Sequence, residues 1–273
     1  MDNGKTISIL GCGWYGFSLA TTLIHKGYTV KGSTTSADKL HKLAAANIKP
    51  YLVSFSADDE NYDPLFFMCD VLWICIPPKI RSDNGEDYLD KINCIINAIK
   101  LNGIKQVVFI SSTGVYGDSN AEVNELSEPL PDSASGKALL QAETLLTQQT
   151  EFQTTIIRFA GLIGPGQDPG RFLAGKKAVP NGNAPVNLIH LTDCIGISCA
   201  ILDKHAFGYA YNACAPSHPT RNDFYTKAAT RLGLEAPEFI AEKKNWKIVS
   251  SVNVEKILDY KYEVDDLMAW LDK

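Results

Sequence analysis

Apolar runs and amphipathic stretches alternate along residues 5–159 of the chain. The apolar runs are short and rich in β-branched residues, as is typical of strands buried on both faces, and they lie at 5–10, 28–30, 51–55, 71–76, 106–110 and 154–159. The stretches between them have the apolar spacing of helices and lie at 17–25, 38–46, 87–101 and 137–149. This alternation predicts βαβ units, and therefore an α/β fold with a Rossmann-type, doubly wound parallel sheet.

The alternation loosens past Gly161. The stretch from Gly164 to Pro185 is rich in Gly and Pro, and the elements after it come at irregular intervals. We therefore expect two units: a cofactor-binding Rossmann domain at 1–165 and a smaller α/β lobe at 166–273, partly interleaved with the first.

Composition narrows the class of protein. The 273 residues are 45% hydrophobic and 21% charged, with a net charge of −5, so the chain is globular and has no broad basic field for a nucleic-acid partner. The seven cysteines form no C-x-x-C pair, which favours reduced, buried thiols over disulfides or a zinc site. We find no signal-peptide pattern and no apolar stretch long enough for a membrane. These features predict a cytoplasmic protein without a membrane partner or a metal.

A glycine motif follows the first apolar run. Residues 11–16 read Gly-Cys-Gly-Trp-Tyr-Gly, a G-x-G-x-x-G pattern between a strand and a helix. Gly11 permits the tight turn, Gly13 permits a pyrophosphate to approach the backbone, and Gly16 permits close helix–strand packing. The N-terminus of the following helix offers free N–H groups to phosphates, and Trp14 and Tyr15, within the motif, are expected to belong to the cofactor site. A dinucleotide site is favoured over a merely structural glycine turn.

The end of the second strand predicts which dinucleotide binds. An NAD enzyme usually has a carboxylate about 20 residues after the glycine motif, where it binds the ribose 2′-hydroxyl. Here the chain has the hydroxyls of residues 33–36, including Thr34 and Thr35, with Lys31 and Lys39 nearby. No carboxylate repels a 2′-phosphate, so NADP is favoured and NAD stays possible. Ile76 and Pro77, at the end of the apolar run 71–76, are expected to complete the cofactor site.

Residues 110–117 read Ile-Ser-Ser-Thr-Gly-Val-Tyr-Gly. This segment resembles the Ser-Ser-x-x-Val-Tyr-Gly segment of the extended short-chain dehydrogenases/reductases. Further segments make the chain similar to the atypical, YeeZ-type subgroup, often labelled NAD-dependent epimerase/dehydratase-like, and they lie at 158–166, 169–176, 187–193 and 211–219. The resemblance covers essentially the whole chain.

The resemblance implies a role for Ser112, four residues before Tyr116, in polarising the substrate oxygen; the alternative is an ordinary polar strand end. The family's acid/base motif is Tyr-x-x-x-Lys, in which the ammonium lowers the phenol pKa. Lys137 opens the expected helix, but Ser133 stands four residues earlier, and none of the 11 tyrosines has Lys four residues on. Tyr116 either replaces the missing acid/base or only packs, and Lys137 either holds the nicotinamide ribose or is a solvated lysine.

Three residues of the second lobe are candidates for substrate binding. Arg171 lies in a Gly-x-x-x-x-Gly-Lys segment that lacks the hydroxyl of a phosphate loop, so it either meets an anionic substrate or is surface charge. His190 is more typical of a structural histidine than of a catalytic one. His218 is placed to line the substrate pocket.

Two functions follow from this sequence. The first is an NAD(P)-dependent oxidoreductase or epimerase/dehydratase that transfers hydride on a small polar substrate, with sugar nucleotides and carbonyl compounds as candidate classes. The second is an NADP(H)-binding sensor or scaffold whose catalysis has degenerated. The absent Tyr-x-x-x-Lys motif favours the second, and Ser112 with Lys137 favours the first.

Overall fold

The fold is built on a parallel sheet of seven strands. The computed structural model describes residues 4–56, 60–78 and 86–273. The strands, in their order across the sheet, are β12 (Ala210–Ala213), β9 (Gln153–Phe159), β7 (Gln106–Ser112), β6 (Val71–Ile74), β1 (Thr6–Leu10), β2 (Thr29–Thr34) and β3 (Lys49–Leu52). Every neighbouring pair is parallel. This order confirms the predicted Rossmann-type, doubly wound sheet.

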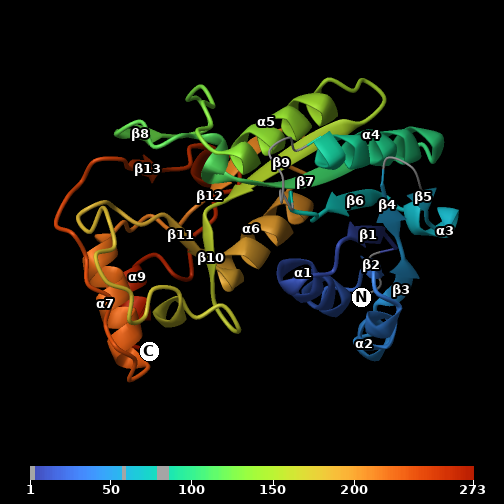
Figure 1. Ribbon diagram of the computed structural model, residues 1–273. Coiled ribbons are helices and arrows are strands. Elements are labelled where there is room, and N and C mark those ends of the chain that lie inside the picture. The colour runs from blue at the N-terminus through green and yellow to red at the C-terminus, as the bar shows by residue number, and fades with distance from the viewer. Residues whose placement is uncertain (1–3, 57–59, 79–85) are drawn as a thin grey trace.

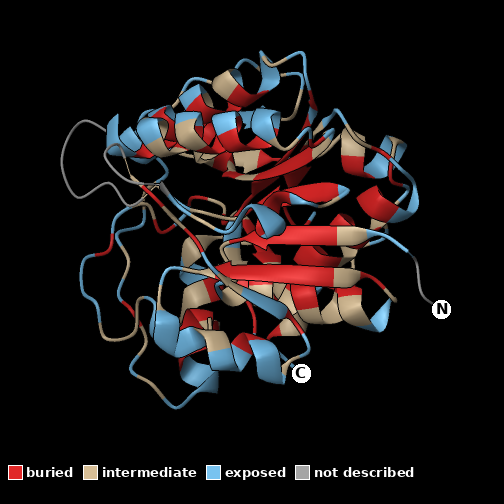
Figure 2. Ribbon diagram, turned by 90° about the vertical axis from the view of Figure 1, so that its right-hand side faces the viewer, coloured by how far each residue is buried: buried red, intermediate tan, exposed pale blue. Residues whose placement is uncertain are grey.

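Helices cover both faces of the sheet. Figure 1 shows α4 (Glu86–Leu101) and α5 (Ala134–Thr147) on one face, and α1 (Trp14–His25) with α6 (Leu191–Asp203) on the other. In Figure 2 the central strands are buried along most of their length, whereas each helix buries only the stripe that faces the sheet. This difference is the physical origin of the two sequence patterns, continuous apolar runs for strands and apolar residues at helical spacing for helices.

The strand order reverses beside β1. The chain first builds β2 and β3 outward on one side of β1, and then returns to place β6 on the other side. Connections leave the carboxyl ends of β1 and β6 in opposite directions, which opens a crevice between them. The glycine motif follows β1 and Cys75 follows β6, so both lie at this crevice.

A second apolar core forms the smaller lobe. It packs β10 (Gly161–Ile163) and β11 (Leu188–His190) with α7 (Arg221–Arg231) and α9 (Leu267–Trp270). α6 and β12 lie between these segments in sequence, yet they pack into the main core, so the two units interleave. Because the chain crosses between the cores more than once, the division at residue 165 stays a prediction.

Shorter elements complete the described chain. They are the 3₁₀ turns η1 (Ala37–Lys39), η2 (Thr113–Val115) and η3 (Pro169–Arg171), the helices α2 (Leu40–Ala45), α3 (Pro64–Phe67) and α8 (Asn253–Lys256), and the strands β4 (Ser54–Phe55), β5 (Glu60–Asn61), β8 (Ala121–Val123) and β13 (Lys247–Val249). β8 and β13 pair with each other and join the C-terminal segment to the segment that follows β7.

The expected elements differ from the observed ones mainly at their ends. The helix expected at 17–25 begins at Trp14, and that expected at 137–149 begins at Ala134, because each starts at a capping residue that the apolar spacing does not include. The strand expected at 51–55 is divided into β3 and β4, since Ser54 and Phe55 turn away to form a hairpin with β5. Across the described ranges, no helix combines the length and apolarity needed to cross a bilayer.

Candidate functional site

Two glycines of the motif are fixed by close backbone approaches. Gly11 has a φ of +97°, and a Cβ on it would lie 3.0 Å from the carbonyl oxygen of Cys75. A Cβ on Gly16 would lie 2.5 Å from the carbonyl oxygen of Gly11. The loop is also tied to β2, because the N–H of Gly11 donates to Ser33 Oγ and that of Cys12 to the Ser33 carbonyl, each at 2.9 Å. Helix α1 is therefore held with its N-terminus at the crevice.

Gly13 differs from the other two glycines. It is the N-cap of α1, with a φ of −77°, and a Cβ on it would meet no protein atom within 4 Å. The space above it is open. The next three N–H groups, of Trp14, Tyr15 and Gly16, open α1 and have no partner within the helix. An open space beside free N–H groups at a positive helix end fits a pyrophosphate.

Two cavities border the glycine loop. The first, of about 460 Å³, extends from the loop between the ends of β2 and β6 to α4, and its walls include Gly11, Gly13, Thr34, Thr35, Ile76 and Pro77. The second, of about 380 Å³, lies on the α1 side and has Trp14 and Lys42 in its wall. Cys12, Gly13, Thr34 and Lys39 line both. The structure thus brings together the predicted cofactor residues from three separate strand ends.

Tyr15 and Lys31 have structural roles. The Tyr15 ring is buried, its hydroxyl hydrogen-bonds Ser198 Oγ at 2.6 Å and accepts from Trp73 Nε1 at 3.2 Å, and burial raises the phenol pKa well above its usual value. Only the backbone N–H of Tyr15 is left for a phosphate. The Lys31 ammonium donates to the carbonyl oxygens of Leu65 at 2.5 Å and Met68 at 2.6 Å, so it stabilises the end of α3 and is not directed at a cofactor.

Ser112 ends β7 at the same edge of the sheet. Its Oγ accepts a hydrogen bond from the N–H of Gly114 at 3.1 Å, which leaves its own proton free to donate. Lys137 lies exposed in the first turn of α5. The turn after Ser112 and the helix that carries Lys137 meet closely, since a Cβ on Gly136 would overlap the carbonyl oxygen of Gly114.

Ser133 occupies the position of the family's catalytic tyrosine. It is the N-cap of α5, and its Oγ accepts from the N–H of Gly136 at 3.1 Å. The Ser133 hydroxyl caps the helix, but a serine side chain is several bonds shorter than a tyrosine side chain at the same position would be. In this structure Ser133 serves as the helix cap.

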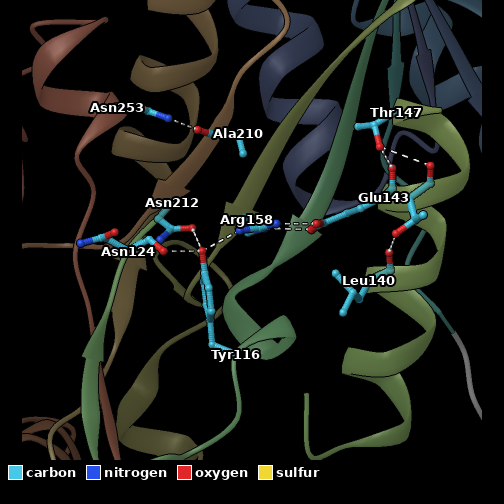
Figure 3. Close-up of polar contacts among 10 residues, drawn as sticks. Tyr116, Asn124, Leu140, Glu143, Thr147, Arg158, Ala210, Asn212 and Asn253 are labelled. Carbon is cyan, nitrogen blue, oxygen red and sulfur yellow. Dashed lines mark hydrogen bonds and ion pairs between the residues drawn. The ribbon is translucent and has the colours of Figure 1, made fainter. Parts of the chain in front are cut away.

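Tyr116 lies in a buried polar network (Figure 3). Only 1% of it is exposed, and its hydroxyl donates toward the carbonyl oxygen of Asn124 at 2.9 Å and Asn212 Oδ1 at 3.2 Å. The same oxygen accepts from Arg158 Nη1 at 2.6 Å. Burial raises the pKa of the phenol, although the guanidinium opposes the shift. Of the two roles open to Tyr116, the geometry supports packing, because neighbours already occupy its hydroxyl.

Arg158 connects this network to α5. Its guanidinium forms two hydrogen bonds with the Glu143 carboxylate, Nε to Oε1 at 3.0 Å and Nη2 to Oε2 at 2.6 Å (Figure 3). Arg158 is 6% exposed and Glu143 3%. The sequence motifs did not indicate this pair, since its members lie 15 residues apart and neither has a distinctive local pattern.

The three substrate candidates lie in or beside the smaller lobe. His190 is the N-cap of α6, where its Nδ1 accepts from the N–H of Thr192 at 3.3 Å, and burial lowers its pKa and favours the neutral ring. His218 donates from Nδ1 to the carbonyl oxygen of Val186 at 3.0 Å. Arg171 is exposed at the end of η3. None of the three lines the two cavities at the glycine loop.

A third hollow, of about 720 Å³, lies between α7 and α9, and its cations are paired with carboxylates. Lys227 binds Asp272 at 2.7 Å, and Arg231 binds Asp168 at 2.7 Å. This hollow shares no residue with the glycine loop. Within the described ranges, no group of three or more His, Cys, Asp or Glu side chains is placed to hold a metal ion.

Comparisons with known proteins agree with the cofactor site. A family model described as NAD(P)H-binding matches residues 11–189. The protein YeeZ of Escherichia coli (strain K12) is 36% identical over 268 residues, which cover 96% of this chain and 97% of YeeZ.

Solved structures share the fold at lower sequence identity. UDP-glucuronic acid 4-epimerase from Bacillus cereus, in complex with NAD, matches with a TM-score of 0.80 and 19% identity over 98% of this chain and 96% of that one. A functionally unknown conserved protein from Silicibacter pomeroyi matches with a TM-score of 0.79 and 22% identity over 98% and 97% of the two chains.

The ion pair between Arg158 and Glu143 is predicted to be essential for stability. Glu143→Ala should lower the free energy of unfolding by about 3–5 kcal/mol, because it leaves the Arg158 charge buried and unpaired. Urea denaturation measures the loss. The control is Asp203→Ala, which breaks the exposed Lys26–Asp203 pair and should cost at most about 1 kcal/mol. Equal losses in the two variants would contradict the prediction.

Proposed function

Because the chain belongs to the YeeZ-type, NAD(P)H-binding branch of the short-chain dehydrogenases/reductases, we propose that it is an NAD(P)-dependent oxidoreductase or epimerase/dehydratase. Its reaction is hydride transfer on a small polar substrate, either as a net oxidoreduction or with the hydride returned to the same molecule. The observation that carries this proposal is the open space above Gly13 at the strand-order reversal, with the free proton of Ser112 at the same sheet edge.

Each residue of the site has a distinct task in this proposal. The α1 N-terminus binds the pyrophosphate, and the first cavity takes the adenosine half beside Ile76 and Pro77. A nicotinamide bound there supplies the hydride donor or acceptor. Ser112 donates its hydrogen bond to the substrate oxygen on which charge develops, and Lys137 binds the nicotinamide ribose. Arg171 and His218, in the smaller lobe, contribute to the binding of a polar or anionic substrate.

The cofactor we propose is NADP. Thr34 and Lys39 line both cavities, and the exposed Thr35 lines the first, so hydroxyls and an ammonium stand where a 2′-phosphate would project. Lys42 adds a second positive charge in the smaller cavity, where its ammonium lies 5.0 Å from the centre of the Phe17 ring. Two cations and several hydroxyl donors favour a phosphate over a ribose hydroxyl.

The alternative is an NADP(H)-binding sensor or scaffold. The observation that favours it is the loss of a free phenol: Ser133 caps α5, and the Tyr116 hydroxyl is held by three partners. A chain with this site binds the cofactor as an enzyme does but has no side chain in the usual place to move the proton. The two functions differ in whether bound cofactor turns over.

Cofactor binding should depend on the open space at Gly13. In Gly13→Val the new side chain enters the space proposed for the pyrophosphate, so NADPH binding measured by fluorescence should be lost. The folded protein has room for that Cβ, so the thermal unfolding of the variant should stay cooperative. Gly16→Ala is the contrasting variant, since its Cβ collides with the Gly11 carbonyl and should destabilise the protein itself. Undiminished NADPH binding by Gly13→Val would overturn the cofactor assignment.

Cofactor choice should depend on Thr34 and Lys39. Thr34→Asp should weaken NADPH binding by about tenfold or more and strengthen NADH binding, because a carboxylate repels the 2′-phosphate and accepts from the 2′-hydroxyl. Lys39→Met should weaken the binding of NADPH and leave the binding of NADH unchanged. Titration of each variant with both cofactors provides the control within one sample. A wild-type protein that already binds NADH about tenfold more tightly, a difference of about 1.4 kcal/mol, would contradict the preference for NADP.

Turnover should depend on Ser112 more than on Tyr116. Ser112→Ala should lower kcat by about 10²–10³ with little change in cofactor affinity, since it removes a donor to the reacting oxygen. Tyr116→Phe should instead lower stability by about 1–3 kcal/mol, because it removes a buried hydrogen-bond partner. Ser111→Ala is the matched control, since the buried Ser111 Oγ has no partner among the described residues, so its removal should leave kcat unchanged and should not lower stability.

The assay follows cofactor absorbance over a panel of sugar nucleotides and small carbonyl compounds, with dissociation constants measured in parallel. Turnover that Ser112→Ala does not reduce would refute the role given to Ser112. If no compound turns over and partner binding instead follows the NADP/NADPH ratio, the sensor is the correct function.

A further inference from the structure

A hydrogen bond joins the glycine loop to the start of the smaller lobe. The indole Nε1 of Trp14, the first residue of α1, donates to the carbonyl oxygen of Pro165 at 2.7 Å. The two residues are 151 positions apart in the sequence. Neither the cofactor motif nor the lobe needs this bond for its own folding, because each has its own core.

Pro165 belongs to a tight turn at residues 164–167. Gly164 and Gln167 exchange two backbone hydrogen bonds, of 3.2 and 2.9 Å, which close the turn. Gly164 has a φ of +139°, and a Cβ on it would lie about 3 Å from Leu191 and His190 at the start of α6. The turn is thus held between the α6 N-terminus and Trp14, directly after β10.

The turn and the indole border the cavity on the α1 side of the glycine loop. The wall of this cavity includes Gly13, Trp14, Pro165 and Leu191, together with the Thr34 and Lys39 proposed for the 2′-phosphate. A dinucleotide with its pyrophosphate at Gly13 would therefore have the bond between Trp14 and Pro165 beside it. A dinucleotide that leaves on that side would pass the turn.

We propose that Trp14 is a positioning residue that latches the 164–167 turn beside the bound dinucleotide and slows its release. This inference rests on the proposed function, since it requires a nicotinamide dinucleotide at the glycine loop. One neutral hydrogen bond contributes modestly to a barrier, so the latch tunes residence time and does not decide whether binding occurs. Slow release suits a reaction that returns the hydride to the substrate before the cofactor exchanges.

The test measures how fast NADPH leaves the full-length protein. Protein loaded with NADPH is mixed with excess NADP⁺, and release is followed by the cofactor's own fluorescence, which no tryptophan substitution alters directly. Trp14→Phe keeps an aromatic ring and removes the N–H donor. It should raise the release rate by about threefold to tenfold, with a smaller change in the association rate. Trp246→Phe is the matched control, because Trp246 contacts Lys243 and lines neither cavity.

A second variant acts on the other side of the same contact. Gly166 has a φ of +80°, and a Cβ on it would lie 3.7 Å from Trp14 Nε1, so Gly166→Ala strains the turn while leaving the indole in place. It should also accelerate release. If both substitutions act through one latch, the double variant should release NADPH no faster than the faster single variant.

The outcomes separate the latch from the proposed function. A release rate of Trp14→Phe equal to that of the wild type overturns the latch and leaves the cofactor site intact. The latch is also overturned if Trp246→Phe raises the release rate as much as Trp14→Phe does. It is overturned as well if the effects of the two single substitutions on the release rate add fully in the double variant. A wild-type protein that binds neither NADPH nor NADH overturns the proposed function and the latch together. Urea denaturation without cofactor confirms that each variant is folded.

Discussion

The glycine loop depends on the close approach of α1 to the strand that precedes it. The carbonyl oxygen of Gly11 lies where a side chain at position 16 would stand, and Gly11 itself packs on the carbonyl of Cys75. These contacts place the end of β1, the end of β6 and the start of α1 within a few ångströms of each other. The site that results is made of backbone groups, since it consists of N–H donors around an open space. Side chains such as Ser33 only fix the loop in place.

The smaller lobe is attached by single side chains that each bind several backbone groups. Asp193 accepts from the N–H groups of Glu263 and Val264 and from the Tyr260 hydroxyl. The Asn187 side chain accepts a hydrogen bond from the N–H of Val249 and donates one to the carbonyl oxygen of Lys247. These two bonds hold β13 in place. Asp193 satisfies three donors, and Asn187 satisfies one donor and one acceptor, so replacing either side chain is costly because its partners would be left unpaired. These polar contacts act together with apolar residues of the C-terminal segment, such as Val254 and Leu258, that pack into the main core.

The sequence predicts which strand ends meet at the glycine loop, whereas it does not predict the polar contacts of Tyr116 and His190, for a physical reason. Gly11, Gly13, Thr34 and Ile76 come together because parallel strands place their carboxyl ends on one edge, so strand ends located from local patterns also locate the site. The role of Tyr116 depends on partners far away in the chain, Arg158 and Asn212, and the His190 ring packs on the distant Trp270. The hydrophobic periodicity of the sequence gives no information about such partners. The same limit explains why α6 and β12, although placed in the second lobe by sequence, pack into the main core.

The loss of the phenol changes how the proton reaches the site but does not remove every route. Gly114 and Gly136 still bring the end of β7 and the start of α5 into contact, so the geometry that would serve a tyrosine at position 133 persists without it. The Lys137 ammonium is exposed there, and water can enter the space that a phenol would fill. The absence of a general acid typically lowers the rate by a factor of about 10²–10⁴. This loss is smaller than the total acceleration that an enzyme gains from positioning the cofactor and from stabilising charge on the substrate oxygen. The proposed enzyme would therefore be slow. A slow enzyme that holds its cofactor for long times has the same physical properties as a sensor of the NADP/NADPH ratio, so the two functions differ in rate rather than in architecture.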